Sequence, residues 1–294
     1  MAVLVIGGAG YVGAHAVRAL RAAGARVVVL DDLSTGHRRL VPADVPLHVG
    51  EVEDRARLLR LLRGEATGDK IDAVMMFAAC SLVGESQEAP RKYFERNCGG
   101  ILALAGAMVD AGVRDVVLSS SAAVYGEATR PVLDERHPRQ PTNVYGTTKM
   151  FAEDVLAAYQ AHGLRSVALR YFNAAGADPS GEIGEHHERE THLIPVVLDA
   201  ILGLREAVTV FGTDYPTEDG TCVRDYVHVS DLADAHVRAL AYLAGGGAST
   251  QMDLGSTTGT TVREVIAAAE AVTGRSVPAR DGARRAGDPA RLVT

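Results

Sequence analysis

The chain has 294 residues, of which 47% are hydrophobic and 23% charged, as expected for a globular protein with one large α/β domain or two domains. Its formal net charge of −7 argues against a nucleic-acid partner, since the phosphate backbone is bound by excess positive charge. No apolar run of membrane-spanning length and no signal-peptide pattern occurs, so we predict neither a membrane span nor secretion. Three widely spaced cysteines without a C-x-x-C pair indicate reduced thiols in the cytoplasm.

Short apolar runs alternate with longer amphipathic stretches along the first 170 residues. The runs are continuous and rich in β-branched residues, as buried parallel strands are. They lie at Val3–Ile6, Val27–Leu30, Ala73–Phe77, Val116–Leu118 and Val167–Leu169. The helical stretches between them lie at Tyr11–Ala23, Arg55–Arg63, Pro90–Ala111 and Tyr145–His162. This alternation predicts an α/β fold with a doubly wound parallel sheet of the Rossmann type.

The pattern loosens after residue 170. A loop rich in glycine and charge comes first, and shorter elements follow, including helices near Val229–Leu243 and Val262–Val272. We therefore expect a dinucleotide-binding domain at 1–170 and a smaller substrate domain at 171–294, partly interleaved with the first.

A glycine-rich turn joins the first strand to the first helix. Gly7, Gly10 and Gly13 have the spacing G-x-x-G-x-x-G, and glycine lets a backbone turn sharply and lie against a pyrophosphate. Asp31 ends the second strand 18 residues after Gly13, where a carboxylate accepts from ribose hydroxyls and repels a 2′-phosphate. The sequence thus predicts NAD rather than NADP, against the opposing signal of Arg38 and Arg39.

Tyr145 and Lys149 stand four residues apart at a predicted helix start, so both lie on one helix face. Ser119–Ser121 follow a strand, at the sheet edge where doubly wound folds bind ligands. A phenol with a pKa of ~10 is a poor base, but a nearby cation lowers that pKa by about 1–3 units. We expect Lys149 and an oxidised nicotinamide to make Tyr145 a catalytic base. The plainer alternative is a solvated pair beside a serine turn.

The stretch GEHHERETH (184–192) resembles a metal motif. His187, Glu188 and His192 have the spacing H-E-x-x-x-H, one residue longer than the H-E-x-x-H of a zinc-binding helix. The two histidines would not share a helix face, so we predict a mobile loop and no metal site.

Longer stretches point to one family. They are FAACSLVGES (77–86), LRYFNAAGA (169–177), FGTDYPTEDGTCVRDYVHVSDLADAH (211–236) and RRAGDPARL (284–292). Together with Ser-Ser-Ser-Ala, Tyr-x-x-x-Lys and the glycine motif, they make the chain resemble the UDP-glucose 4-epimerase family of the extended short-chain dehydrogenases/reductases. The resemblance covers the whole chain, and the stretch 211–236 is its most specific part.

The resemblance implies roles for individual residues. Tyr145 would be the base and Ser121 its hydrogen-bond partner, while Lys149 would orient the nicotinamide ribose and lower the pKa of the phenol. Implied contacts to NAD come from Gly7, Gly10, Tyr11, Val12, Gly13, Asp31, Asp32, Leu33, Glu51, Val52, Phe77, Ala78, Ala79, Ser81, Asn97, Ser119, Tyr145, Lys149, Tyr171 and Phe172. Implied contacts to a UDP-sugar come from Ser121, Tyr145, Asn173, His192, Leu193, Val210, Phe211, Arg224, Arg285 and Asp288.

The implied reaction inverts C4 of a UDP-hexose, UDP-galactose to UDP-glucose, through a 4-keto sugar and without net redox change. Ser81 and Glu51 stand where other members have Lys and Asp, and the family's chains usually continue for some tens of residues beyond Thr294. A small residue near Leu292 would admit an N-acetyl sugar, so UDP-N-acetylhexosamines stay open as substrates.

Two other functions would account for parts of the sequence. A nucleotide-sugar dehydratase would need an acid/base pair beside the serine, whereas Ser121-Ala122-Ala123 carries no carboxylate. A non-catalytic NAD sensor would need the glycine motif to bind the cofactor, but its function would not require the pair Tyr145 and Lys149. The apolar helices Pro90–Ala111 and Tyr145–His162 favour a homodimer with a four-helix interface.

Overall fold

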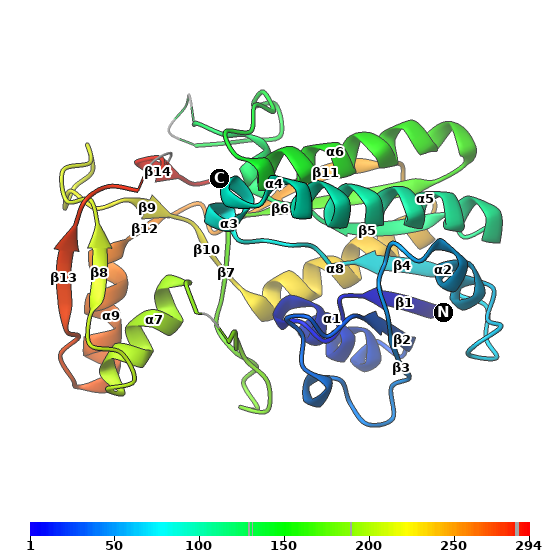
Figure 1. Ribbon diagram of the computed structural model, residues 1–294, viewed down its shortest axis with the longest axis horizontal. Coiled ribbons are helices and arrows are strands. Elements are labelled where there is room, and N and C mark those ends of the chain that lie inside the picture. Colours follow the sequence, from blue (N-terminus) through cyan, green and yellow to red (C-terminus); the bar gives the residue numbers. More distant parts are fainter. Residues whose placement is uncertain (129, 131, 189, 286–287) are drawn as a thin grey trace.

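A parallel seven-stranded sheet forms the centre of the molecule, in the order β11-β6-β5-β4-β1-β2-β3 (Figure 1). The computed structural model describes residues 1–128, 130, 132–188, 190–285 and 288–294. The strands of this sheet are β1 (Ala2–Ile6), β2 (Arg26–Asp31), β3 (Leu47–Val49), β4 (Ala73–Met76), β5 (Asp115–Ser119), β6 (Arg165–Tyr171) and β11 (Thr250–Leu254). Strand order reverses between β1 and β4, the place where doubly wound sheets bind ligands.

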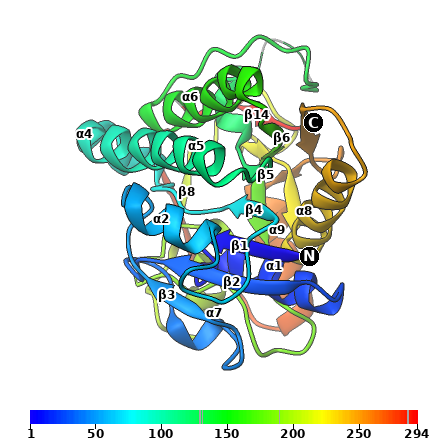
Figure 2. The same cartoon turned by 90° about the vertical axis from the view of Figure 1, so that its right-hand side faces the viewer.

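Two layers of helices cover the sheet (Figure 2). Alternate residues of one strand face opposite layers. Val3 and Val5 belong to the apolar cluster that includes α1 (Tyr11–Ala22) and α8 (Val229–Ala244). Leu4 and Ile6 belong to the cluster that includes α2 (Arg55–Leu62), α5 (Gly99–Ala111) and α6 (Val144–Ala158). The predicted doubly wound α/β fold is therefore confirmed.

The two longest predicted helices each contain a change of helix type. The stretch 90–111 divides into α4 (Pro90–Tyr93), a π-helical turn at Phe94–Cys98, and α5. The stretch from Tyr145 continues beyond α6 as a 3₁₀ turn at Tyr159–His162. The π turn carries Asn97, whose side chain makes bonds described below.

A smaller group of elements lies beside the sheet, at the left of Figure 1. Its helices are α7 (Leu193–Ile201) and α9 (Val262–Thr273). The short helix α3 (Val83–Glu88) does not belong to this group and directly precedes α4. The strand pairs of the group are β8 (Val208–Phe211) with β13 (Ala279–Gly282), and β12 (Thr260–Thr261) and β14 (Arg291–Leu292) with β9 (Val223–Arg224). Between this group and the sheet, β7 (Asn173–Ala175) pairs with β10 (Tyr226–His228).

The chain returns to the main sheet after residue 170. Helix α8 packs on the same face as α1, and β11 pairs with β6 along residues 250–254. The division at residue 170 and the interleaving of the two domains stay predictions. Within the described residues, no helix is both long enough and apolar enough to cross a membrane.

A buried ion pair fixes α6 on the sheet. Arg170 of β6 donates from Nε and Nη2 to the two carboxylate oxygens of Glu153, at 2.9 and 2.6 Å. Ser120, directly after β5, donates to the same carboxylate at 2.6 Å. Glu153 and Arg170 are each 3% exposed. Glu153 lies one turn beyond Lys149, so this contact sets where Tyr145 and Lys149 stand relative to the strand ends.

Replacing Glu153 with glutamine should lower the free energy of unfolding by about 3–5 kcal/mol, because the Arg170 guanidinium would stay buried without its counter-charge. Urea denaturation measures the change. The matched control is Asp234→Asn, which breaks the exposed Arg238–Asp234 pair on α8 and should cost less than about 1 kcal/mol. Equal effects of the two variants would contradict an anchoring role for Glu153.

Candidate active site

The glycine turn after β1 is packed too closely for side chains. Gly7 has φ +82°, and a Cβ there would lie 2.5 Å from the backbone nitrogen of Ala78. A Cβ on Gly13 would lie 2.0 Å from the carbonyl oxygen of Gly7. Gly10 begins α1 without a side-chain cap, and the first turn carries no acidic residue. The free N–H groups of α1, a 12-residue helix, therefore suit an anion such as the pyrophosphate of a dinucleotide.

Asp31 holds the next loop. Its carboxylate accepts from the backbone N–H groups of Ala9 and Leu33, both at 2.9 Å. Burial raises the pKa of this carboxyl, while those two hydrogen bonds lower it. Leu33 has φ +59°, which is rare for a leucine and typical of backbone held for a function. Arg38 and Arg39 are exposed. The loop is thus ordered by the same acid that we expect to face the adenosine ribose.

Tyr145, Lys149 and the serines meet where β5 ends and α6 begins. The Lys149 Nζ donates to the carbonyl oxygen of Ser119 at 2.8 Å and lies 5.8 Å from the centre of the Tyr145 ring. Ser121 lies close enough to the phenol to lower its pKa. Asn143 caps α6 by accepting from the N–H of Gly146 at 2.8 Å, so the first turn that carries Tyr145 is fixed. The three predicted catalytic side chains therefore lie together.

Burial shifts the pKa values of Tyr145 and Lys149 so that it disfavours the charged form of each side chain. It raises the pKa of the Tyr145 phenol, as Tyr171 does to a smaller degree, whereas the nearby Ser121 hydroxyl lowers it. Burial also lowers the pKa of the Lys149 ammonium to about 8, against the opposing influence of Glu153. Without the cofactor, loss of water around a phenolate is thus the largest influence on the pKa of Tyr145, and the expectation that Lys149 and an oxidised nicotinamide together make it a base stays a prediction.

Asn97 connects the end of β4 to α6. Its amide donates to the Cys80 carbonyl at 3.0 Å and to the Thr148 hydroxyl at 2.9 Å, and its oxygen accepts from the Cys80 N–H at 2.8 Å. It is 5% exposed and lies in the π-helical turn, a feature that is frequent at functional sites. Asn97 thus positions the segment that contains Phe77–Ala79, which we predict to line the cofactor.

The rings of Phe77 and Tyr171, both predicted to line the cofactor, contact a histidine that the sequence did not indicate. His236 of α8 lies 4.6 Å from Phe77 and 6.2 Å from Tyr171 between ring centres. Tyr171 also shares a 2.5 Å hydrogen bond with the Ser119 hydroxyl. His236 is fully buried, and burial lowers its pKa to about 4, so the ring is neutral. Its only sequence signal is a polar residue on the apolar face of α8.

Arg96 is a second residue that sequence reasoning missed. It lies 3.0 Å from Glu51, 3.3 Å from Glu53 and 3.9 Å from Asp32 in ion pairs. It thereby joins two of the acids predicted near the adenosine. Of the other predicted cofactor positions, Tyr11 and Val12 open α1, Ser81 is exposed, and Val52, Ala78 and Phe172 pack at the edges of apolar clusters.

Most of the predicted sugar-nucleotide residues lie in the smaller group of elements, while Asn173 lies in β7 and Ser121 and Tyr145 lie at the edge of the main sheet. Arg224 donates from Nη2 to Asp288 at 2.6 Å, and the Arg285 guanidinium lies 4.0 Å from the centre of the Phe211 ring. Asn173 donates to the Asp225 carbonyl at 3.1 Å. The remaining positions are His192 and Leu193 at the start of α7, and Val210 in β8, next to Phe211. Ala286, Gly287 and Arg189, which belong to quoted sequence stretches, lie outside the described residues.

Comparisons with known proteins agree with this geometry. A sequence model of the NAD dependent epimerase/dehydratase family matches residues 3–255. The UDP-glucose 4-epimerase of Lacticaseibacillus casei is 48% identical, covering 100% of this chain and 88% of its own length. The solved structure of the UDP-glucose 4-epimerase from Brucella ovis in complex with NAD has a TM-score of 0.95 and 46% identity, over 100% of this chain and 89% of that one. The enzyme from Stenotrophomonas maltophila, solved with NAD and a formylated UDP-arabinopyranose, has a TM-score of 0.94 and 42% identity, over 100% and 89%.

Proposed function

This chain belongs to the NAD-dependent epimerase/dehydratase family, and we propose that it is an NAD-dependent enzyme that inverts C4 of a UDP-hexose, interconverting UDP-galactose and UDP-glucose. One observation carries the proposal. Tyr145, Ser121 and Lys149 lie together at the carboxyl edge of the sheet, in a chain nearly half identical, over its full length, to enzymes of that activity.

NAD, when bound, would accept the hydride from C4 of the sugar and return it. The uncapped start of α1 and the Asp31 loop fit its pyrophosphate and adenosine ribose. In the reaction that we propose, Tyr145 takes the proton of the sugar 4-hydroxyl and later returns it, while Ser121 hydrogen-bonds the phenol. Lys149 supplies one positive charge beside the phenolate. The buried phenol needs a second positive charge, which the nicotinamide of bound NAD⁺ would provide.

The nucleotide would be held by the smaller group of elements. A guanidinium suits a diphosphate, because its fork of N–H donors matches pairs of phosphate oxygens. Arg224 is held in place by Asp288, and Arg285 is exposed above Phe211. We assign the diphosphate to these two arginines, with Asn173, His192, Leu193 and Val210 around the rest of the UDP.

The choice of sugar has a second candidate. Leu292 packs against the apolar cluster of Ala122, Val124 and Tyr125, which follows Ser121 in the chain. Leucine is smaller than an aromatic side chain and would leave more room beside the sugar. UDP-N-acetylhexosamines are therefore the alternative substrates. A dehydratase is less favoured, because Ser121 is followed by the short apolar 3₁₀ helix Ala122–Val124 and not by a carboxylate.

We also propose that the enzyme is a cytoplasmic homodimer. The reducing cytoplasm suits its three free cysteines. Phe94, Leu102 and Phe151 are 42%, 45% and 37% exposed in the layer of α4, α5 and α6 (Figure 2). Large exposed apolar side chains on one layer of helices favour a surface that a second copy covers.

Purified protein given UDP-galactose, with no added cofactor, should form UDP-glucose. Tyr145→Phe should lower kcat by about 10²–10⁴-fold, because the proton acceptor is lost, and should leave NAD bound. Tyr159→Phe, in the 3₁₀ turn after the same helix, is the matched control and should keep its activity. Activity of Tyr145→Phe within tenfold of the unaltered chain would contradict the proposal. Running the N-acetyl analogue in the same assay decides between the two sugars.

The solution mass tests the dimer. Light scattering should give twice 30.9 kDa for the unaltered chain and 30.9 kDa for Phe151→Glu, since a charge would stand in the apolar interface. A single-chain mass for the unaltered protein would rule the dimer out.

A further inference from the structure

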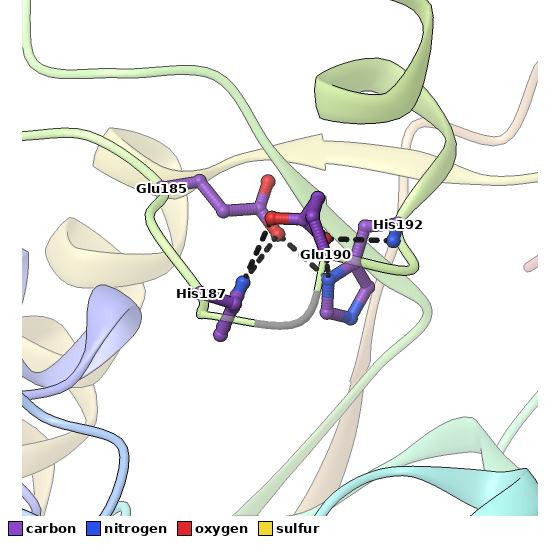
Figure 3. Close-up of side chains that lie close together, drawn as sticks. All are labelled: Glu185, His187, Glu190 and His192. Atoms are coloured by element: carbon purple, nitrogen blue, oxygen red, sulfur yellow. Dashed lines mark hydrogen bonds and ion pairs between the residues drawn. The ribbon is translucent and has the colours of Figure 1, made fainter. Parts of the chain in front are cut away.

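Two histidines and two glutamates converge in the loop that leads into α7. Figure 3 shows the side chains of Glu185, His187, Glu190 and His192 turned toward one point. One oxygen or nitrogen from each of them lies within 4.8 Å of the others. We infer that this cluster binds one divalent metal ion, of which Zn²⁺ fits best, apart from the proton and hydride transfers of the proposed reaction; His192 would then belong both to this site and to the edge of the proposed UDP site.

The spacing of the four ligand atoms suits zinc. The His192 Nδ1 lies 2.9 Å from an oxygen of Glu185 and 2.9 Å from one of Glu190. The His187 Nδ1 lies 3.0 Å from Glu190 and 3.6 Å from Glu185. Zinc bonds of about 2.0–2.1 Å in a tetrahedron place neighbouring ligand atoms roughly 3.3 Å apart. These four separations bracket that value, and one ligand atom from each residue lies within 4.8 Å of the others, so the cluster is close in size to a zinc site.

Burial and charge also favour a cation here. The Glu185 and Glu190 side chains are only 9% and 10% exposed, which is rare for carboxylates without a counter-charge. Glu190 is held rigidly, since one oxygen accepts from the N–H groups of Thr191 and His192, both at 2.8 Å. Two imidazoles and two carboxylates are ligands that Zn²⁺ accepts.

The expectation of no metal rested on helical spacing. Residues 185–188 and 190–192 form no helix, so a rule about helix faces does not apply to them. The ligands are His187 and His192 with Glu185 and Glu190, whereas Glu188, the acid in the H-E-x-x-x-H pattern, is not among them.

A bound ion would hold this loop between the two halves of the proposed site. His192 is the residue before α7, and Glu185 is close enough to Tyr11, at the start of α1, to influence its pKa. The alternative occupant is protons, because two imidazolium ions would also balance two carboxylates. Metal and protons compete for the same Nδ1 atoms, so zinc binding would release protons.

The test uses the full chain with its cofactor, freed of metal by a chelator and dialysed against ZnCl₂. We expect one zinc per chain by elemental analysis. The double variant Glu185→Gln/His187→Gln should bind at least about 100-fold more weakly, because two of four ligands are lost. The matched control His186→Gln/Glu188→Gln changes the same residue types one position along and should bind normally. Circular dichroism verifies that each variant is folded, and the single variants Glu185→Gln and His187→Gln serve if the double variant is not.

Cobalt provides a second readout independent of activity. Co²⁺ at this site should give the visible spectrum of a four-coordinate ion without thiolate charge transfer, which excludes Cys80, Cys98 and Cys222 as ligands. The inference fails if zinc does not bind at micromolar concentrations, if the double variant binds as well as the control, or if the cobalt spectrum shows thiolate ligation. Failure here would leave the proposed epimerase activity untouched, because that is measured without added metal.

Discussion

The contact between α6 and the ends of β5 and β6 is the constraint on which the site depends. Tyr145, Lys149 and Glu153 follow one another at intervals of four residues, so a single helix face carries a phenol, an ammonium and a carboxylate. Glu153 binds Arg170 and Ser120, and Lys149 binds the Ser119 carbonyl. Helix α6 cannot slide or turn without breaking these bonds. The position of the phenol at the sheet edge therefore follows from an ion pair that takes no part in the proposed chemistry.

The same burial that orders this site drives its groups toward their neutral forms. It raises the pKa of Tyr145 and lowers that of Lys149 to about 8. The phenol alone does not provide a charged base at neutral pH, whereas a pKa of about 8 leaves the Lys149 ammonium mostly charged. A phenolate becomes favourable only when further positive charge lies beside it, and the proposed NAD⁺ brings that charge. In this account the phenol acts as a base only opposite oxidised cofactor, which links proton removal to hydride transfer.

Much of this arrangement could be predicted from the sequence, because it is encoded locally. Continuous β-branched runs gave the central strands, and the pair Tyr145 and Lys149 lies within one helical turn. Contacts between distant segments could not be predicted. Asn97 and Arg96 act through residues far away in the sequence, and β11 joins β6 across about 80 positions. Glu153 did have a signal, the same spacing of four that joins Tyr145 to Lys149. The convergence of Glu185, His187, Glu190 and His192 was not predicted, although the stretch was considered, because these side chains come from a loop, where spacing carries no information about direction.

The return of hydride to the carbon that lost it is the central claim, and an isotope measures it directly. UDP-galactose that carries deuterium at C4 should give UDP-glucose with the deuterium still at C4 when the enzyme works in ordinary water. Mass spectrometry and NMR of the product locate the label. Retention of the label is the predicted result, because the hydride stays within one site. Replacement of the deuterium by solvent hydrogen would contradict the account, because inversion would then proceed by loss of a C4 proton to water.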